Sequence, residues 1–212
     1  NKQKNLMETF YSICKKSNIN LVVLNDIQQA CCGQIFSSKG FSNAFEYTAN
    51  EILEKMWQSS NEGLMPIVID VSSCQYTLKS ILPVLNPANK TKFHKLRILD
   101  SIDFIHEYVM PYQKAVNPKN EIVLHPVCSL QKLKTQDKFL EIAKAYAGKV
   151  NVPLNVGCCG MAGDRGFLVP ELTASATFEE AKEVKLCPSE AYYSSTKTCE
   201  MAMSEAVGVN YE

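Results

Sequence analysis

Short apolar runs alternate with amphipathic stretches along the whole chain. Four apolar runs predict buried strands, at residues 21–24, 66–71, 96–99 and 122–124. The stretches between them predict helices at residues 44–58, 102–112 and 131–146. The polar stretch 86–95 predicts a loop. Strands that alternate with helices in this way are typical of α/β domains with mostly parallel sheets.

An internal repeat divides this pattern into two parts. Cys31-Cys32-Gly33 returns as Cys158-Cys159-Gly160, at an offset of 127 residues. Cys74 returns as Cys199, at an offset of 125 residues, and each of these late cysteines opens an expected helix. We therefore expect two similar Rossmann-like α/β repeats packed with pseudo-two-fold symmetry.

The expected boundary between the repeats is the polar stretch Asn117–Asn120. It gives a first domain at residues 1–117 and a second at residues 118–212. The second domain has Cys128 at a strand-to-helix turn, 30 residues before Cys158, and the same place in the first domain is position 1. Because the sequence begins at Asn1 rather than Met, we expect a fragment of a longer protein whose first domain has lost this cysteine upstream.

Charge and hydropathy narrow the classes of function. The 22 basic and 22 acidic residues give no net charge, which argues against nucleic acid as the main partner. No apolar run reaches the roughly 18 residues of a transmembrane span, and the N-terminus lacks a secretory signal pattern. We find no Walker loop, no GxGxxG and no Ser-His-Asp arrangement, so neither a nucleotide site nor a hydrolase triad is indicated.

The nine cysteines point to metal chemistry rather than to a disulfide scaffold. An odd number, two adjacent pairs and no signal peptide fit disulfides poorly. Thiolates that lie where strands end and helices begin bind zinc or iron–sulfur clusters. The sequence predicts a four-thiolate site made of Cys128, Cys158, Cys159 and Cys199, and an incomplete three-thiolate site made of Cys31, Cys32 and Cys74.

Buried, inert cysteines are the alternative to a metal site, and this is the interpretation we give to Cys14 and Cys187. His125, three residues before Cys128, either lines the site or is a satisfied core histidine, and the second interpretation is favoured. Arg165 either offsets charge at the second site or forms a surface pair with Asp164.

Two stretches of sequence resemble a known family. The stretches GCCGMAGDRG at residues 157–166 and PELTASA at residues 170–176 are similar to the cysteine-rich CCG region of FAD-dependent D-lactate dehydrogenases, and so is ACCGQIFSSKG at residues 30–40. The resemblance covers essentially the whole chain. In that family an N-terminal flavin domain and a ferredoxin-like segment precede paired CCG domains. Related CCG domains occur in glycolate oxidase iron–sulfur subunits and in heterodisulfide reductase.

The resemblance implies the C-terminal electron-transfer module of a flavin- and iron–sulfur-dependent D-2-hydroxyacid (D-lactate) dehydrogenase. FAD would belong to the missing N-terminal part, and the partners would be the flavin and ferredoxin-like domains and a quinone or cytochrome acceptor. A 4Fe-4S cluster or zinc would lie at the second site. The expected location is cytoplasmic, with a peripheral place at the inner membrane face as an option, and the fragment alone is expected to be inactive.

One departure from the family pattern limits this interpretation. The fullest CCG motif ends in Cys-x-x-Cys and supplies five thiolates, whereas Val71 and Thr196 stand where the first of those two cysteines would be. Each site then has four thiolates at most, which favours a conventional cluster or zinc over heterodisulfide-reductase-like thiol chemistry. A zinc-binding or metal-free structural or docking domain remains the alternative.

Overall fold

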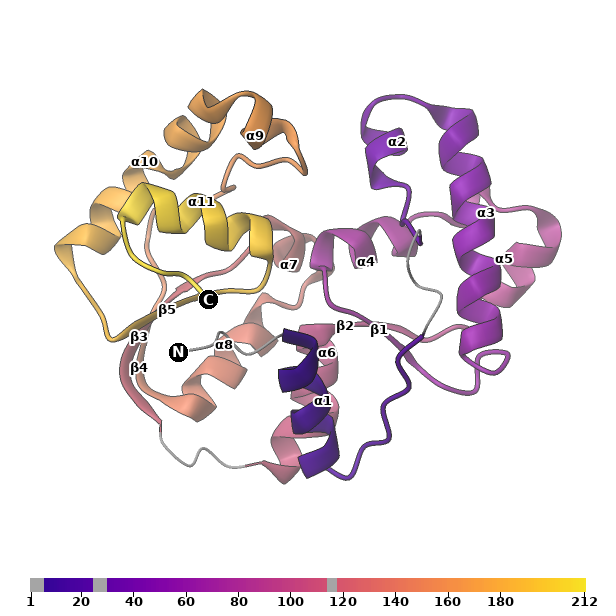
Figure 1. The fold of residues 1–212 in the computed structure, drawn as a ribbon, viewed down its shortest axis with the longest axis horizontal. Helices are drawn as coiled ribbons and strands as arrows, with labels where there is room; N and C mark the ends of the chain where they lie inside the picture. Colours follow the sequence, from indigo (N-terminus) through magenta and orange to yellow (C-terminus); the bar gives the residue numbers. More distant parts are fainter. Residues whose placement is uncertain (1–5, 25–29, 114–117) are drawn as a thin grey trace.

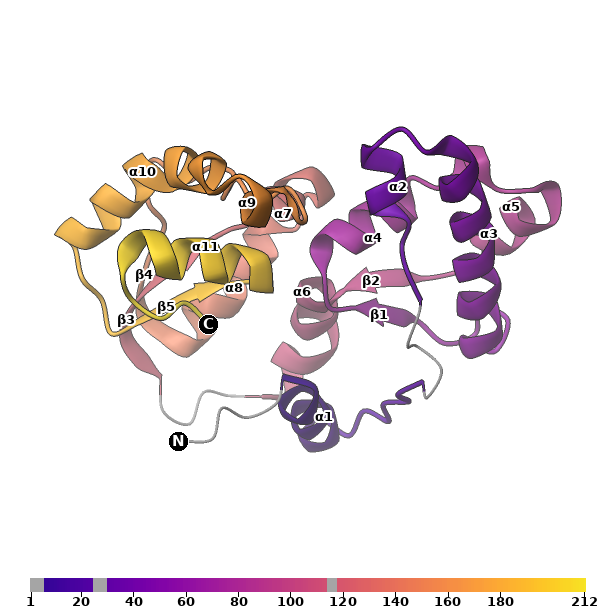
Figure 2. The ribbon, with the colours of Figure 1, turned by 45° about the horizontal axis from the view of Figure 1, so that its top comes forward.

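Each half of the chain contains a small sheet of short parallel strands at its centre. The computed structural model describes residues 6–24, 30–113 and 118–212, which form two lobes side by side (Figures 1 and 2). Residues 6–112 build one lobe and residues 118–212 build the other. The mixture of helices and small parallel sheets confirms the α/β class.

The first lobe has a two-stranded parallel sheet of β1 (Ile67–Ile69) and β2 (Ile98–Asp100), in which Val68 pairs with Leu99. Its α-helices are α1 (Leu6–Lys16), α2 (Gln34–Ser38), α3 (Ser42–Ser59), α4 (Ser72–Lys79), α5 (Pro87–Phe93) and α6 (Ser101–Phe104). The shorter helical segments are the 3-10 turn η1 (Leu82–Val84), the π-helical turn η2 (Ile105–Val109) and the 3-10 turn η3 (Met110–Tyr112).

The second lobe has a three-stranded parallel sheet in the order β4-β3-β5. The strands are β3 (Lys119–His125), β4 (Ala147–Asn151) and β5 (Ala191–Ser194). The helices are α7 (Cys128–Leu133), α8 (Gln136–Tyr146), α9 (Arg165–Leu168), α10 (Pro170–Leu186) and α11 (Lys197–Val207). The central strand β3 therefore directs its carboxyl end at the start of α7.

Both sheets are covered by side chains on two faces. On β3, Ile122 and Leu124 join one buried cluster, while Val123 joins another on the opposite face. Successive residues of a strand point to opposite faces, so a strand that is buried on both sides becomes a continuous apolar run. The same alternation separates Ile98 from Leu99 on β2. This two-sided burial explains why the sequence predicted these strands correctly.

The lobes contact each other in two places, and one of these contacts is made by helices that carry cysteines. Helix α4 packs against α7, and the Lys132 ammonium lies 5.3 Å from the centre of the Tyr76 ring. In the second contact, η2 packs against α8. There, the Lys138 Nζ lies 2.6 Å from an oxygen of Asp103. Because α4 holds Cys74 and α7 holds Cys128, both cysteine sets lie close to the seam between the lobes.

The strand predicted at residues 21–24 is wrong. These residues form no strand, and Val22 and Val23 are 60% and 47% exposed. An isolated strand leaves its peptide groups unpaired, so it needs a neighbour to form. Within the described ranges, no β-bridge joins residues 21–24 to another segment. Only Leu21 packs against a buried cluster, the one that contains Leu99.

The loop predicted at residues 86–95 is also wrong, because it contains α5. Asn86 caps this helix by accepting a hydrogen bond from the Asn89 N–H at 2.9 Å, and Pro87 occupies its first position. A capping asparagine followed by proline strongly favours the start of a helix. The loop was predicted because the stretch is polar, and composition takes no account of this cap.

Two predicted helices and the predicted boundary are also modified. The helix at residues 131–146 is two helices, α7 and α8, because Lys134 adopts a left-handed φ of 59°. The helix at residues 102–112 changes from α to π to 3-10 geometry. In the predicted boundary, Asn117 lies outside the described residues, while Lys119 and Asn120 begin β3 instead of a loop. Among the described residues, no helix is long and apolar enough to cross a membrane.

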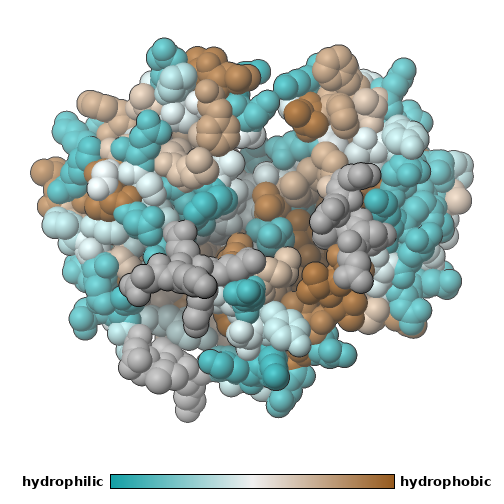
Figure 3. Space-filling model, in the orientation of Figure 1, coloured by the Kyte–Doolittle hydropathy of each residue, from teal (hydrophilic) through white to brown (hydrophobic). Residues whose placement is uncertain are grey.

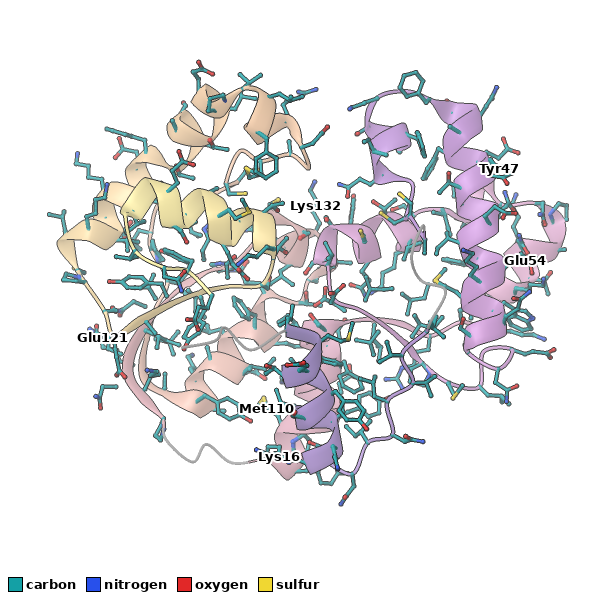
Figure 4. All side chains as sticks on the ribbon, in the orientation of Figure 1. Lys16, Tyr47, Glu54, Met110, Glu121 and Lys132 are labelled. Carbon is teal, nitrogen blue, oxygen red and sulfur yellow. The ribbon has the colours of Figure 1, made fainter. Side chains whose placement is uncertain are left out.

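Helix α3 offers a direct test of the first lobe's core. Leu53 on this helix is fully buried, whereas Tyr47, labelled on the same helix in Figure 4, is 69% exposed. We expect Leu53→Ala to lower the free energy of unfolding by about 2–5 kcal/mol, because it leaves a cavity. The matched change Tyr47→Ala should alter it by no more than about 0.5 kcal/mol. Urea unfolding measures both, and equal losses would contradict the described packing of α3.

Candidate functional site

The two Cys-Cys-Gly motifs adopt the same turn. Gly33 and Gly160 both have a φ of 79°, in the left-handed region that favours glycine. This turn brings a backbone N–H back towards the second cysteine of each motif. The N–H of Gln34 lowers the pKa of the Cys32 thiol, and the N–H of Met161 lowers that of the Cys159 thiol. The glycine is therefore needed for the conformation that holds the thiol.

Gly160 also lies against backbone atoms of α10. A Cβ at this position would be 2.7 Å from the Leu172 carbonyl oxygen and 2.9 Å from the Thr173 Cα. At Gly33 the nearest atom, at 2.9 Å, belongs to the ring of Phe45, which can rotate away. The second motif is thus fixed more tightly against its neighbouring helix than the first.

The three predicted cysteines of the first lobe lie close together, two of them at this turn and the third on α4. The Cys32 Sγ lies 3.1 Å from the Cys74 Sγ, and Cys74 is the third residue of α4. The Cys31 Sγ accepts from the Gly33 N–H at 3.4 Å, and Cys31 itself is exposed. The first set is therefore a close pair with a third thiol beside it.

The four predicted cysteines of the second lobe also come together. The Cys159 Sγ and the Cys199 Sγ lie 2.8 Å apart, and both residues are buried. Cys128, the first residue of α7, is partly buried, and Cys158 is exposed. Burial and the neighbouring Cys158 raise the pKa of the Cys128 thiol. The four thiols thus interact at the carboxyl ends of β3 and β5.

Each close pair combines one acidic thiol with one that holds its proton. The hydrogen bond with Cys199 lowers the pKa of Cys159 to about 6, and the hydrogen bond with Cys74 does the same for Cys32. The same hydrogen bonds, together with burial, raise the pKa of Cys199 and of Cys74. At neutral pH each pair therefore consists of one thiolate and one thiol.

The cysteine sulfurs are donors that suit a soft or borderline metal. The distances between them, however, are those of hydrogen-bonded thiol pairs. Two thiolates bound to one tetrahedral zinc lie about 3.8 Å apart, given Zn–S bonds of about 2.3 Å. The two close pairs, at 2.8 and 3.1 Å, are tighter than that. Over the described ranges, no group of three or more His, Cys, Asp or Glu side chains is arranged to hold a metal ion. Metal binding would require each close pair to separate by about 1 Å.

The remaining cysteines lie away from these sets. Cys14 is fully buried in the cluster that joins α1 to α6, and burial raises its pKa. Cys187 is exposed at the carboxyl end of α10. Cys14 is therefore buried, as expected, whereas the expectation of a buried Cys187 is wrong, because this residue lies where α10 ends at the surface.

The surface ion pair expected between Asp164 and Arg165, beside the second site, does not form. Asp164 pairs with Lys39 of the other lobe at 3.5 Å, rather than with Arg165. This contact joins the turn that follows Gly160 to the turn that follows Gly33. Exposed apolar side chains, among them Phe41 and Leu168, lie near these turns, and Figure 3 shows apolar surface at the top of both lobes.

Sequence reasoning missed one functional candidate, the partner of His125. His125 is a buried core histidine, and its Nδ1 lies 2.8 Å from one oxygen of the Glu180 carboxylate and 3.0 Å from the other. It is not fully satisfied, as the favoured interpretation required, because its buried Nε2 has no hydrogen-bond partner among the described residues. Glu180 belongs to the buried face of α10 with Ala181 and Val184. The available signal was a glutamate beside Ala181 and four residues before Val184, because a carboxylate on an apolar helix face requires a partner.

Alanine in place of Gly160 tests the tightness of the second turn. We expect Gly160→Ala to lower the free energy of unfolding by about 2–4 kcal/mol, from the left-handed φ and from contact with α10 backbone. Gly163→Ala is the matched control, since Gly163 has a φ of 81° and no neighbouring atom within 4 Å of the place where a Cβ would lie. The control should cost only about 1 kcal/mol. Equal losses in urea unfolding would contradict the close approach of Gly160 to α10.

The hydrogen bond between Cys159 and Cys199 predicts a titration change. In metal-free protein, Cys199→Ala should raise the pKa of Cys159 from about 6 towards the ordinary value of 9.0, because the thiolate loses its partner. The ultraviolet absorbance of thiolate near neutral pH should fall accordingly. The exposed Cys187→Ala provides the control, and an unchanged Cys159 titration in Cys199→Ala would exclude the thiol–thiolate pair.

Comparison with known proteins finds two similarities, one to a family of domains and one to a dehydrogenase subunit. Residues 1–79 match the CCG family, described as a cysteine-rich domain. The chain is 24% identical over 149 residues to the C subunit of the anaerobic glycerol-3-phosphate dehydrogenase of Escherichia coli K12, and equally to that of Escherichia coli O157:H7. The alignment covers 66% of this chain and 36% of each relative, so the chain spans about a third of their length. Residues 1–79, which contain the first Cys-Cys-Gly motif, therefore match the cysteine-rich CCG domain that the motifs indicated.

Proposed function

We propose that this chain is an electron-transfer module of a flavin- and iron–sulfur-dependent oxidoreductase. The observation that carries the proposal is the gathering of four thiols, from Cys128, Cys158, Cys159 and Cys199, at the carboxyl ends of β3 and β5. The similarity to one subunit of a dehydrogenase supports a place in an oxidoreductase. In such an enzyme this module would pass electrons on rather than bind the substrate.

We further propose that residues 1–117 and 118–212 are two CCG domains related by repetition. The equal turns at Gly33 and Gly160 support this. So does the position of Cys74 and Cys199 as third residue of the helix that follows β1 or β5. The sheets differ, since β1 pairs with β2 whereas β5 pairs with β3. The repeats would therefore share the cysteine-bearing half of the fold and differ in the rest.

At the second site, the four cysteines would hold a 4Fe-4S cluster or zinc. A cluster supplies one-electron redox chemistry when bound, whereas zinc supplies a structural crosslink only. The chain contributes several features to such a site. Cys159 is already a thiolate near neutral pH, the left-handed Gly160 keeps a side chain away from the turn, and the burial of Cys159 and Cys199 excludes water.

The finer assignment follows the resemblance to D-lactate dehydrogenases. We propose that the parent enzyme oxidises a D-2-hydroxy acid such as D-lactate with FAD held in another part of the protein. Electrons would pass from the flavin and ferredoxin-like domains through this module to a quinone or cytochrome acceptor. The module would then work in the cytoplasm or at the inner membrane face.

A second candidate is thiol redox chemistry, which the short sulfur–sulfur distances of 2.8 and 3.1 Å favour. Oxidation of the Cys159 thiolate and the Cys199 thiol would form one S–S bond, release one proton and pass two electrons to a disulfide acceptor. The acceptor would take up that proton and one from solvent as its S–S bond breaks into two thiols. Val71 and Thr196, the residues before α4 and α11, supply no further thiol. A zinc-binding or metal-free docking domain is the remaining possibility.

Anaerobic iron and zinc analysis distinguishes these functions. After reconstitution with iron and sulfide, we expect the chain to bind about four iron atoms and to show broad visible absorption. Cys159→Ala should lose nearly all iron bound at the second site, because this buried thiolate is central to the set. Cys187→Ala, at an exposed cysteine outside both sets, should retain it. Stoichiometric zinc without iron would reject electron transfer, and iron retained by Cys159→Ala would reject this ligand set.

A further inference from the structure

The first lobe supplies three thiols where a four-thiolate metal site needs four. Cys31, Cys32 and Cys74 form its set, and its remaining cysteine, Cys14, is fully buried in the cluster that joins α1 to α6. The other five of the nine cysteines belong to the second lobe. Because tetrahedral zinc and a 4Fe-4S cluster both take four protein ligands, the cysteines of the first lobe fit neither group. Their arrangement supports a chemistry that needs only two thiols.

Two of these thiols are already close to bonding distance. The Cys32 Sγ lies 3.1 Å from the Cys74 Sγ, although the residues are 42 positions apart in the sequence. The S–S bond of a disulfide is about 2.05 Å long, so the two sulfurs must approach each other by about 1 Å. Rotation about the Cα–Cβ bond of a cysteine moves its sulfur by about that much. Closure of this pair is therefore a local movement.

One member of the pair is held in place and the other can adjust. Cys74 lies on α4, which is tied to β2 because the fully buried Gln75 donates from Nε2 to a backbone carbonyl of that strand at 3.2 Å. Cys32 lies on the turn at Gly33, whose close neighbour is the ring of Phe45, which can rotate away. The matching glycine of the second lobe lies against helix backbone instead. The first turn can therefore follow the movement that an S–S bond requires.

The pair of the first lobe is also the more accessible one. Cys32 is 9% exposed and Cys74 is partly exposed, whereas Cys159 and Cys199 are 4% and 5% exposed. Thiol–disulfide exchange begins when one sulfur attacks another, so its rate depends on access to the sulfurs. A small disulfide from solution therefore reaches the first pair more readily than the second.

We propose that Cys32 and Cys74 are a reversible dithiol–disulfide pair, which low-molecular-weight disulfides oxidise and low-molecular-weight thiols reduce. The sulfur–sulfur distance, the adjustable turn and the access from solvent together carry the proposal. It goes beyond the proposed function, since it assigns a chemistry to the first lobe and requires no metal at the second site. Closure would tie the turn at Gly33 to α4, the helix that packs against α7 of the other lobe.

The exchange conserves atoms, charge and electrons. The reduced pair consists of the Cys32 thiolate and the Cys74 thiol. When the S–S bond between them forms, the S–S bond of the external disulfide breaks and takes up the two electrons. One of its sulfurs leaves with the proton of Cys74 as a thiol, and the other leaves as a thiolate. Cys31 is left as the one free thiol of the set.

Mass spectrometry of the metal-free chain tests the pairing. The chain is incubated without oxygen in excess glutathione disulfide, quenched with acid at successive times, alkylated and digested. We expect a peptide crosslinked between Cys32 and Cys74 to form at least about tenfold faster than one between Cys159 and Cys199. Excess reduced glutathione should return both thiols. If Cys32 and Cys74 remain alkylated, or carry separate glutathione groups, the proposal is overturned.

The neighbouring Cys31 provides the matched control. Cys31→Ser keeps both members of the pair, so the crosslink should form at a rate within about twofold of wild type. Cys74→Ser removes one member, so Cys32 should instead accumulate as a mixed disulfide with glutathione. A crosslink from Cys31 to Cys74 in the wild-type chain, or loss of the crosslink in folded Cys31→Ser, would overturn the assignment.

Iron loading separates this inference from the proposed function. In Cys159→Ala, whose second site should hold no iron, we expect less than about one bound iron atom after reconstitution, while the crosslink between Cys32 and Cys74 still forms on oxidation. Iron that this variant retains and that Cys74→Ser releases would show a metal at the first set and contradict the proposal. A wild-type chain that binds no iron yet closes this pair would reject the cluster at the second site and support the dithiol–disulfide pair.

Discussion

The site depends on the geometry of parallel strands that end at a common edge and continue into helices. β3 leads to α7 with Cys128 at its start, and β5 leads to α11 with Cys199 in its first turn. Parallel pairing of β3 with β5 places these two strand ends side by side. Cysteines that are 71 positions apart in the sequence therefore meet without any long loop to hold them.

The same geometry shapes the electrostatics of the sulfurs. Buried thiols normally resist ionisation, because burial disfavours the charged form. In each lobe a neighbouring thiol and a backbone N–H from the glycine turn reverse that preference for one cysteine, Cys32 or Cys159. The second lobe also contains the buried pair of His125 and Glu180, in which Nδ1 lies 2.8 Å from a carboxylate oxygen. The site is thus prepared for negative charge before any group binds.

The features that could be predicted from the sequence are those whose signal lies within a short stretch of residues. Buried strands such as β3 were recognised as apolar runs, and the cysteines were recognised from their spacing, because both signals lie within a short stretch. The strand at residues 21–24 failed because strand formation also depends on a neighbour, which no local pattern reveals. α5 was missed because one capping contact, from Asn86 to Asn89, outweighed the polar composition.

Contacts between distant segments could not be predicted in this way. Glu180 and His125 are separated by 55 positions, and Lys39 and Asp164 by 125. Each pair depends on how whole elements pack, so a single sequence gives only a weak sign of it, such as an acidic residue on an apolar face. Such pairs carry the features that distinguish this site from a generic group of cysteines.

The central claim is that the second set of thiols binds a redox-active metal centre. Iron K-edge X-ray absorption of the chain, prepared anaerobically, measures this most directly. We predict a first coordination shell of sulfur only, with iron–iron scattering from a cluster. Absence of iron together with a zinc edge and a four-sulfur shell would contradict electron transfer and leave a structural zinc site in its place.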